Sequence, residues 1–269
     1  VSKDWRKQTM SFIKQSFYTV GTRIILVFFG LFNSIILARV LEPSGRGVYS
    51  LVVLVSMAMF LLGNLGIGVA NVYFVSKNAF NLRKIISNSL TFSVLMSVIL
   101  ALLLLLLNVP LKPFLKDIKM HYLMIAIFSL PFYFIYNFLN NVLLGLNDIK
   151  KYNIVRLIEG ILLFVFLVVI LLVFKRKIFG AIVSWFGSIV ITALLTVWFL
   201  RKSEKIIPGF DLPVFKQSLN FGIKSYFANL TQFFNYRLDM FLVNFFVNVT
   251  FVGYYAVSVS LAEMLWFLP

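Results

Sequence analysis

Long apolar runs alternate with short polar segments along the whole chain. A helix needs about 20 mostly apolar residues to cross a hydrocarbon core of about 30 Å. The pattern therefore predicts an all-α fold, a multi-pass transmembrane helix bundle. The predicted spans are residues 17–41, 47–75, 86–108, 122–146, 154–174, 178–200, 219–247 and 251–269.

The polar segments between these runs predict an orientation. Short loops that stay in the cytoplasm are enriched in Lys and Arg. The span ends on the side of the N-terminus carry about twice as many Lys and Arg residues as the opposite ends. We therefore expect a cytoplasmic N-terminus.

Composition changes this picture little and excludes several classes of protein. The chain is 61% hydrophobic with a net charge of +16. A basic chain suggests nucleic acid, but these cations form short clusters between apolar runs, which is typical of topology signals and contacts with lipid headgroups. With no cysteine and the single histidine His121, a disulfide framework, a cysteine metal site and a multi-histidine site are excluded. We expect no metal, no cofactor and no nucleic-acid partner.

An internal repeat is suggested by glycines at matching span ends. Gly21 opens the first span and Gly222 the seventh, each two residues before a cation. Gly47 and Gly253 open the second and eighth spans in similar surroundings. Both units start on the same side of the membrane, so the repeat is parallel, which is one transporter architecture.

The repeat predicts how the chain is divided. We expect a six-helix lobe over residues 1–204, a cytoplasmic linker over 205–218 and the first two helices of a second lobe over 219–269. Because the chain starts at Val1 and its last run stops at Pro269, we expect it to be a fragment of a longer protein.

Several short motifs resemble those of bacterial polysaccharide transporters of the O-antigen flippase type. They are ARVLEPSGRGVY at 38–49, GNLGIG at 63–68, NYRLD at 235–239, GYY at 253–255 and LAE at 261–263. Such proteins belong to the multidrug, oligosaccharidyl-lipid and polysaccharide (MOP) exporter superfamily. The resemblance covers the whole chain and implies two helical lobes around a central cavity, in the bacterial cytoplasmic (inner) membrane.

The resemblance also implies a function. An undecaprenyl-diphosphate-linked oligosaccharide, such as an O-antigen repeat unit, would be flipped from the inner to the outer leaflet by alternating access. We expect an ion gradient to drive it, because no nucleotide-binding motif is present. The expected partners are the lipid-linked glycan, membrane lipids and other polysaccharide-assembly proteins.

Other functions remain open at this point. A multidrug exporter or a lipid II flippase of the same superfamily is the main alternative. A membrane-embedded transferase is a weaker one, because the nine acidic residues include no pair at short spacing in a loop that would serve as a base or hold a metal. We therefore expect a transporter rather than an enzyme.

The seventh span carries a polar stripe. Asn220, Lys224, Thr231, Asn235 and Asp239 fall within a face about 100° wide on a helix of 3.6 residues per turn. A polar stripe inside a membrane faces a cavity or another polar helix. Hydrogen bonds between helices would explain it, but the stripe continues for about five turns, which favours a cavity wall.

Cations are the expected ligands of a diphosphate. Arg23, near the start of the first span, has Lys224 as its counterpart in the repeat. We predict that these two cations face each other across the lobes and bind the diphosphate. The alternative for Arg23 is an anchor that reaches to the headgroups.

A third group of polar residues lies in the fourth span. Tyr133, Asn137 and either Asn140 or Asn141 share one helical face. An aromatic ring with amides suits sugar faces and hydroxyls, so we predict glycan contacts here. Hydrogen bonds between helices are the alternative.

Charges within the spans are candidates for ion coupling or for charge pairing, because they are costly in lipid. Glu159 has Arg156 three residues before it, so a local ion pair is its alternative role. Glu263 has no cation nearby in the sequence and is the main candidate for a coupling-ion or proton site. Arg237 points away from the stripe that contains Asp239. Its alternative role to ion coupling is to pair with another helix or to reach the headgroups.

Overall fold

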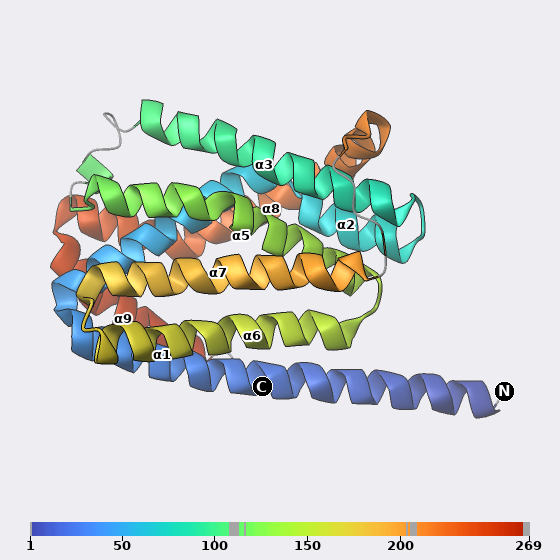
Figure 1. Cartoon of the computed structure of the whole chain (residues 1–269), viewed down its shortest axis with the longest axis horizontal. Helices are drawn as coiled ribbons and strands as arrows, with labels where there is room; N and C mark the ends of the chain where they lie inside the picture. Colours follow the sequence, from blue (N-terminus) through green and yellow to red (C-terminus); the bar gives the residue numbers. More distant parts are fainter. Residues whose placement is uncertain (1, 108–112, 116, 203, 205–208, 266–269) are drawn as a thin grey trace.

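The protein is an all-helical bundle in the part of the chain that the computed structural model describes, which comprises residues 2–107, 113–115, 117–202, 204 and 209–265 (Figure 1). The helices are α1 (Ser2–Asn64), α2 (Ile67–Ser76), α3 (Leu82–Leu106), α5 (Met120–Gly145), α6 (Ile149–Leu167) continued by the π-helix η1 (Val168–Val173), α7 (Lys177–Arg201), α8 (Leu212–Phe246) and α9 (Val249–Leu265). This confirms the predicted fold class.

The helix boundaries differ from the predicted spans at the first loop. The first two spans both lie within α1, which consists of two helices that meet at a kink at Glu42 (φ 60°), just before Pro43. The backbone of Glu42 is not helical, and proline lacks the N–H that an unbroken helix would need, so the helix is interrupted here and the chain changes direction. The second predicted span continues through a break at Leu65 and Gly66 into α2.

Five helices of the described chain are long and apolar enough to cross a membrane. They are Ser16–Asn64 within α1, α3, α5, α6 with η1, and α7. The 35-residue α8 is long enough, but its polar residues keep it out of this set. The helix α9 is apolar but shorter than these five helices, with 17 residues.

The helix α8 begins at Leu212 and so includes the C-terminal part of the predicted linker, 205–218. Asp211 caps the helix by accepting a hydrogen bond from the N–H of Val214 at 3.0 Å. Pro213 lies in the first turn of α8, where a missing N–H costs nothing. A proline that suggested a loop therefore lies at the start of a helix. Residues 205–208 of the predicted linker lie outside the described part of the chain.

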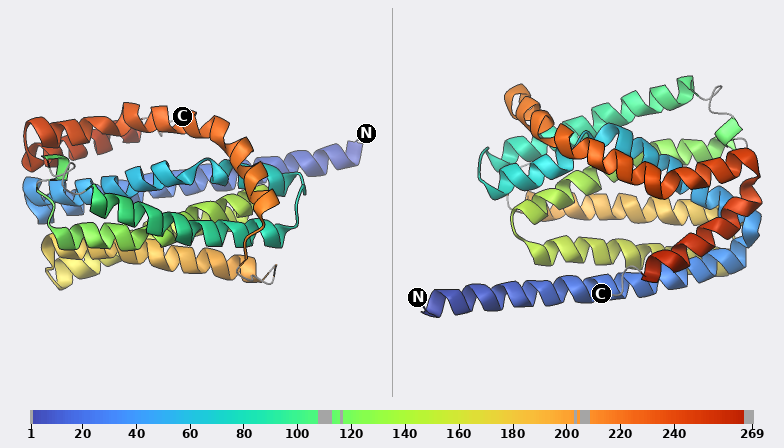
Figure 2. Two further views of the ribbon diagram at one scale, coloured as in Figure 1. Left: turned by 90° about the horizontal axis from the view of Figure 1, so that it is seen from above. Right: turned by 180° about the vertical axis from the view of Figure 1, so that it is seen from behind.

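The helices pack side by side as long rods. In Figure 1, α3, α5, α7 and α6 follow one another across the bundle, and α1 lies beside α6. The curved α8 crosses one face of this bundle, and α9 folds back along α1 (Figure 2). The close packing of α7 is explained by four buried small residues at helical spacing, Ser184, Ser188, Thr192 and Thr196, since small residues let helices approach in lipid.

The outer surface of the bundle is apolar. On α3 alone, Val94, Leu95, Val98 and Leu102 are all exposed. The core meanwhile contains buried aromatic rings of α5, such as Phe134 and Phe138. An apolar surface around a packed core is what a bundle surrounded by lipid requires.

Candidate substrate cavity

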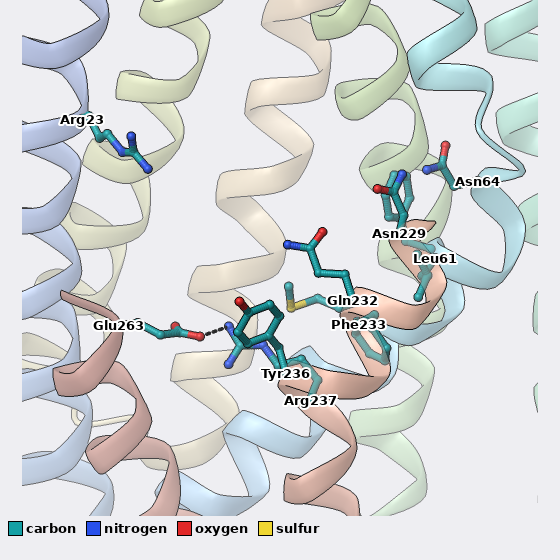
Figure 3. Close-up of a pocket in the computed structure, with 11 residues that line it drawn as sticks. Arg23, Leu61, Asn64, Asn229, Gln232, Phe233, Tyr236, Arg237 and Glu263 are labelled. Carbon is teal, nitrogen blue, oxygen red and sulfur yellow. Dashed lines mark ion pairs between the residues drawn. The ribbon is translucent and has the colours of Figure 1, made fainter. Parts of the chain in front are cut away.

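A cavity of about 580 Å³, here called the central cavity, lies where α8 and α9 face the two halves of α1 (Figure 3). Its lining on α8 follows one helical face. The lining residues are Arg23, Met57, Phe60, Leu61 and Asn64 from α1, Asn229, Gln232, Phe233, Tyr236 and Arg237 from α8, and Glu263 from α9. The lining thus combines aromatic rings, amides and charged groups.

Two smaller cavities adjoin the central one and share lining residues with it. The Arg156 cavity, of about 400 Å³, is lined by Arg156 of α6 together with Arg23 and Glu263. The Arg46 cavity, of about 170 Å³, is lined by Arg46 just beyond the α1 kink, together with Arg237 and Glu263. Because Glu263 lines all three, they lie next to one another in one region beside α9.

An ion pair crosses this region. Nη2 of Arg237 on α8 donates to Oε1 of Glu263 on α9 at 2.8 Å, as the dashed line in Figure 3 marks. The two side chains are 24% and 41% exposed, so water screens the pair in part. Glu263 has no cation near it in the sequence, and its partner comes from the neighbouring helix.

Positive charge predominates around the three cavities. Among their described lining residues, four are arginines, Arg23, Arg46, Arg156 and Arg237, and one is an acid, Glu263. Since Glu263 neutralises one arginine, the region keeps an excess of positive charge. Such a lining attracts anions and repels organic cations.

The polar stripe predicted for α8 does not coincide with the cavity face. Lys224, Thr231 and Asn235 are exposed and are absent from the described lining. The cavity side of α8 is instead the face of Asn229 and Arg237. Of the predicted pair of cations, Arg23 reaches the central cavity and Lys224 does not. The substrate-binding roles of Lys224, Thr231 and Asn235 stay predictions.

The predicted glycan residues of α5 lie one layer behind the cavity. Nδ2 of Asn137 donates to the carbonyl of Tyr133 at 2.8 Å, and Nδ2 of Asn141 donates to the carbonyl of Asn137 at 3.0 Å. The ring of Tyr133 contacts that of Phe60, which lines the central cavity, at 4.9 Å between centroids. These amides bond within their own helix, and their glycan contacts stay a prediction.

The other two predicted carboxylates accept hydrogen bonds from tyrosine hydroxyls of neighbouring helices. Glu159 accepts a hydrogen bond from the hydroxyl of Tyr136 at 2.8 Å. Asp239 accepts hydrogen bonds from its neighbour Met240 N–H and from the hydroxyl of Tyr255 on α9. Neither carboxylate is in the described lining of the three cavities, so Glu263 is the carboxylate that the structure places there.

Sequence reasoning missed Arg46 and Arg156 as cavity residues. Arg46 is one of the cations at the outer ends of the predicted spans, but the structure places it in the second half of α1, where it is buried. Arg156 was considered only as a local partner of Glu159. The signal that could have identified Arg46 was its place between Gly45 and Gly47, because glycines allow a neighbouring helix to approach closely.

Comparisons with known proteins agree with this architecture. A family model described as polysaccharide biosynthesis protein matches residues 12–267. No curated protein gives a significant match.

Solved structures of transporters share the fold. One is an inward-facing multidrug resistance MATE family transporter of the MOP superfamily, with 18% identity, TM-score 0.58, and coverage of 93% of this chain and 58% of that one. A point mutant of a MATE transporter has 17% identity and a TM-score of 0.61, with coverage of 95% of this chain and 65% of that one. A third is a MOP superfamily transporter from Pyrococcus furiosus, which is described as having a binding pocket of reversed polarity. It has 16% identity and a TM-score of 0.56, with coverage of 95% of this chain and 64% of that one. The chain thus spans less than two thirds of the length of these transporters.

Proposed function

Because this chain belongs to the family of polysaccharide biosynthesis proteins, we propose that it is part of a membrane transporter that flips a lipid-linked oligosaccharide. The substrate class is an undecaprenyl-diphosphate-linked glycan, and the direction is from the inner to the outer leaflet. The protein would act in the bacterial cytoplasmic membrane with its N-terminus in the cytoplasm.

The observation that carries this proposal is the charge of the cavity lining. A diphosphate loses strong hydration when it enters a bundle surrounded by lipid, and only paired, hydrogen-bonding charges offset that loss. Guanidinium groups bind phosphoryl oxygens better than ammonium groups do, because their donors match the spacing of those oxygens. The cavities offer arginines from three helices, with Arg23, Arg156 and Arg237 on α1, α6 and α8.

The remaining lining suits the glycan. The lining contains the amides of Asn64, Asn229 and Gln232 and the rings of Tyr236 and Phe60. Amides exchange hydrogen bonds with sugar hydroxyls, and aromatic rings cover the apolar faces of sugars. The polyprenyl tail would stay in the bilayer against the apolar outer surface.

Two close helix contacts frame the cavity and support alternating access. Gly66 at the start of α2 lies against Gly222 of α8, and Gly47 beyond the α1 kink lies against α9 near Gly253. Apart from Arg23, the cavity residues of α1 lie between Gly47 and Gly66 in the sequence, and those of α8 lie between Gly222 and Gly253. We propose that one contact opens at a time, so that the cavity faces one leaflet and then the other.

A multidrug exporter is the main alternative within the superfamily. Its usual substrates are organic cations, which the excess of arginines around the cavities disfavours. The fold similarity to MATE transporters does not decide between the two, because one fold serves several substrates.

The test is a deletion of the full-length gene in its source bacterium. We expect lipid-linked glycan to accumulate on the inner leaflet and surface glycan to be lost. Complementation with Arg23→Gln should fail at normal protein abundance. Arg39→Gln, which alters an exposed arginine of the same helix, should complement. Unchanged surface glycan after deletion would contradict the proposal.

A further inference from the structure

Arg46 is an arginine that the bundle buries without satisfying it. Its side chain is 7% exposed, and its Nε and Nη1 have no hydrogen-bond partner. The guanidinium lies 5.5 Å from the centroid of the Tyr49 ring, which is a weak attraction at this distance. Buried donors of a charged group that lack acceptors cost stability, so their presence in a fold calls for a ligand or another functional reason.

The location of Arg46 explains why it is buried. It lies on α1 four residues after the kink at Glu42, between two glycines that let neighbouring helices approach. From there it lines the Arg46 cavity, and Arg237 and Glu263 line the same space from α8 and α9. That cavity is about 170 Å³, whereas a water molecule in the liquid occupies about 30 Å³. It therefore has room for a small polyatomic anion.

We propose that Arg46 and Arg237 form a phosphoryl-binding subsite at the kinked end of the cavity. A phosphoryl group there would accept hydrogen bonds from the unsatisfied donors of Arg46 and be attracted by Arg237. This deepens the proposed function and rests on it for the source of the ligand: the diphosphate of the lipid-linked glycan would be held by Arg23 and Arg156 at one place and by Arg46 and Arg237 at another.

Glu263 makes the two proposed phosphoryl-binding positions different. It is paired with Arg237 at 2.8 Å and lines both the Arg156 and the Arg46 cavities. An incoming phosphoryl group would compete with this carboxylate for Arg237, whereas Arg46 has donors already available. Arg46 is therefore the residue on which binding at the kinked end depends most.

The same phosphoryl chemistry has two sources in a membrane. One is the diphosphate of a polyprenyl-linked glycan, and the other is the headgroup of an anionic phospholipid. Both present oxygens with negative charge at the level of the lipid interface, so the test needs one arm for each.

The first arm uses the full-length protein in nanodiscs that contain only zwitterionic lipid. Farnesyl diphosphate is titrated and its affinity measured by calorimetry for wild type, Arg46→Met, Arg46→Lys and Arg39→Met. We expect Arg46→Met to weaken binding by roughly tenfold or more, Arg46→Lys to weaken it less, and Arg39→Met, an exposed arginine of the same helix, to bind like wild type. The second arm replaces the probe with phosphatidylglycerol in the disc. If Arg46→Met loses affinity in either arm, the subsite is supported, and the arm in which the loss occurs identifies the source of the phosphoryl group. If Arg46→Met keeps wild-type affinity in both arms, the proposal is overturned.

A thermal measurement separates ligand binding from a structural role. Methionine has a similar length without the buried charge, so Arg46→Met should melt at or above the wild-type temperature in the absence of anion. The probe should then raise the melting temperature of wild type and not that of the variant. A variant that melts lower and is stabilised by the probe as much as wild type would overturn the proposal. If instead the wild-type protein moves no lipid-linked glycan but keeps Arg46-dependent phosphoryl binding, the proposed function fails and the subsite stands.

Discussion

Gly47 of α1 and Gly253 of α9 lie against each other's helices in a reciprocal way. A Cβ atom on Gly47 would overlap the carbonyl oxygen of Val249, four residues before Gly253. A Cβ atom on Gly253 would overlap the carbonyl oxygen of Pro43, four residues before Gly47. This symmetry is expected of two copies of one helix pair, as the repeat at Gly47 and Gly253 predicts. Both neighbours are backbone atoms, so no side chain can rotate away to make room.

Replacing either glycine by alanine therefore tests the crossing. Within a helix, replacing glycine by alanine stabilises the protein by about 0.8–1.0 kcal/mol through helix propensity. Overpacking a close contact destabilises it by about 1–3 kcal/mol. Gly21→Ala provides the matched control, because a Cβ atom on this α1 glycine meets nothing within 4 Å. The propensity gain cancels in the comparison, so Gly47→Ala and Gly253→Ala should be less stable than Gly21→Ala by about 1–3 kcal/mol.

The measurement is unfolding of the purified variants in one detergent, followed by helical circular dichroism against increasing denaturant. We expect Gly21→Ala at or above wild type and both crossing variants below it. Equal stability of all three alanine variants would show that α9 does not pack on α1 at these glycines, and the reasoning for the contact at the kinked end would fail.

Three further outcomes follow from the charges. In a double-mutant cycle, Arg237→Gln and Glu263→Gln should show a coupling free energy of about 0.5–1 kcal/mol, since the pair is partly exposed; independent effects would exclude the pair. In transport assays, Glu263→Gln should lower the dependence of flipping on the ion gradient at normal abundance, and wild-type dependence would remove Glu263 as the coupling residue. Outside the spans, hydrogen bonds from Lys84 and from the N–H of Val214 hold the pKa of Asp211 below its usual value. This contribution to stability is present above the unfolded pKa of about 3.9 and is lost as pH falls through the folded pKa. The difference in melting temperature between wild type and Asp211→Asn should therefore shrink in acid; a constant difference from pH about 7 to about 3 would contradict it.

Hydropathy was sufficient to predict the helices, because lipid allows only segments whose backbone groups are bonded internally. It did not predict that the break between the first two spans is a kink at Glu42 instead of a longer loop, since Pro43 and Gly45 indicate a loop as readily as a kink. The start of α8 at Leu212, inside the predicted linker, was likewise not predicted. In each case the local sequence favours two structures, and packing of the neighbouring helices selects one.

The cavity face of α8 could not be predicted from polarity alone. This helix carries polar residues on several sides, so Asn229 and Gln232 mark one face and Thr231 and Asn235 another. Which face meets α1 depends on the rotation of α8, and the sequence of one helix does not contain that angle. The pair of Arg237 and Glu263 depends in the same way on how α8 crosses α9.

Glu263, the one acid among the described lining residues of the three cavities, has a physical reason in the proposed transporter. A site that holds its substrate must also release it, so binding strong enough for entry but weak enough for exit is required. Four arginines without a counter-charge would hold a diphosphate too tightly for release, because each arginine adds to the attraction for the anion. Glu263 lines all three cavities and competes for Arg237. On this reasoning its carboxylate limits how tightly the anion is held, and a change in its protonation would shift the balance between holding and release, which is the point at which an ion gradient can act on the cycle.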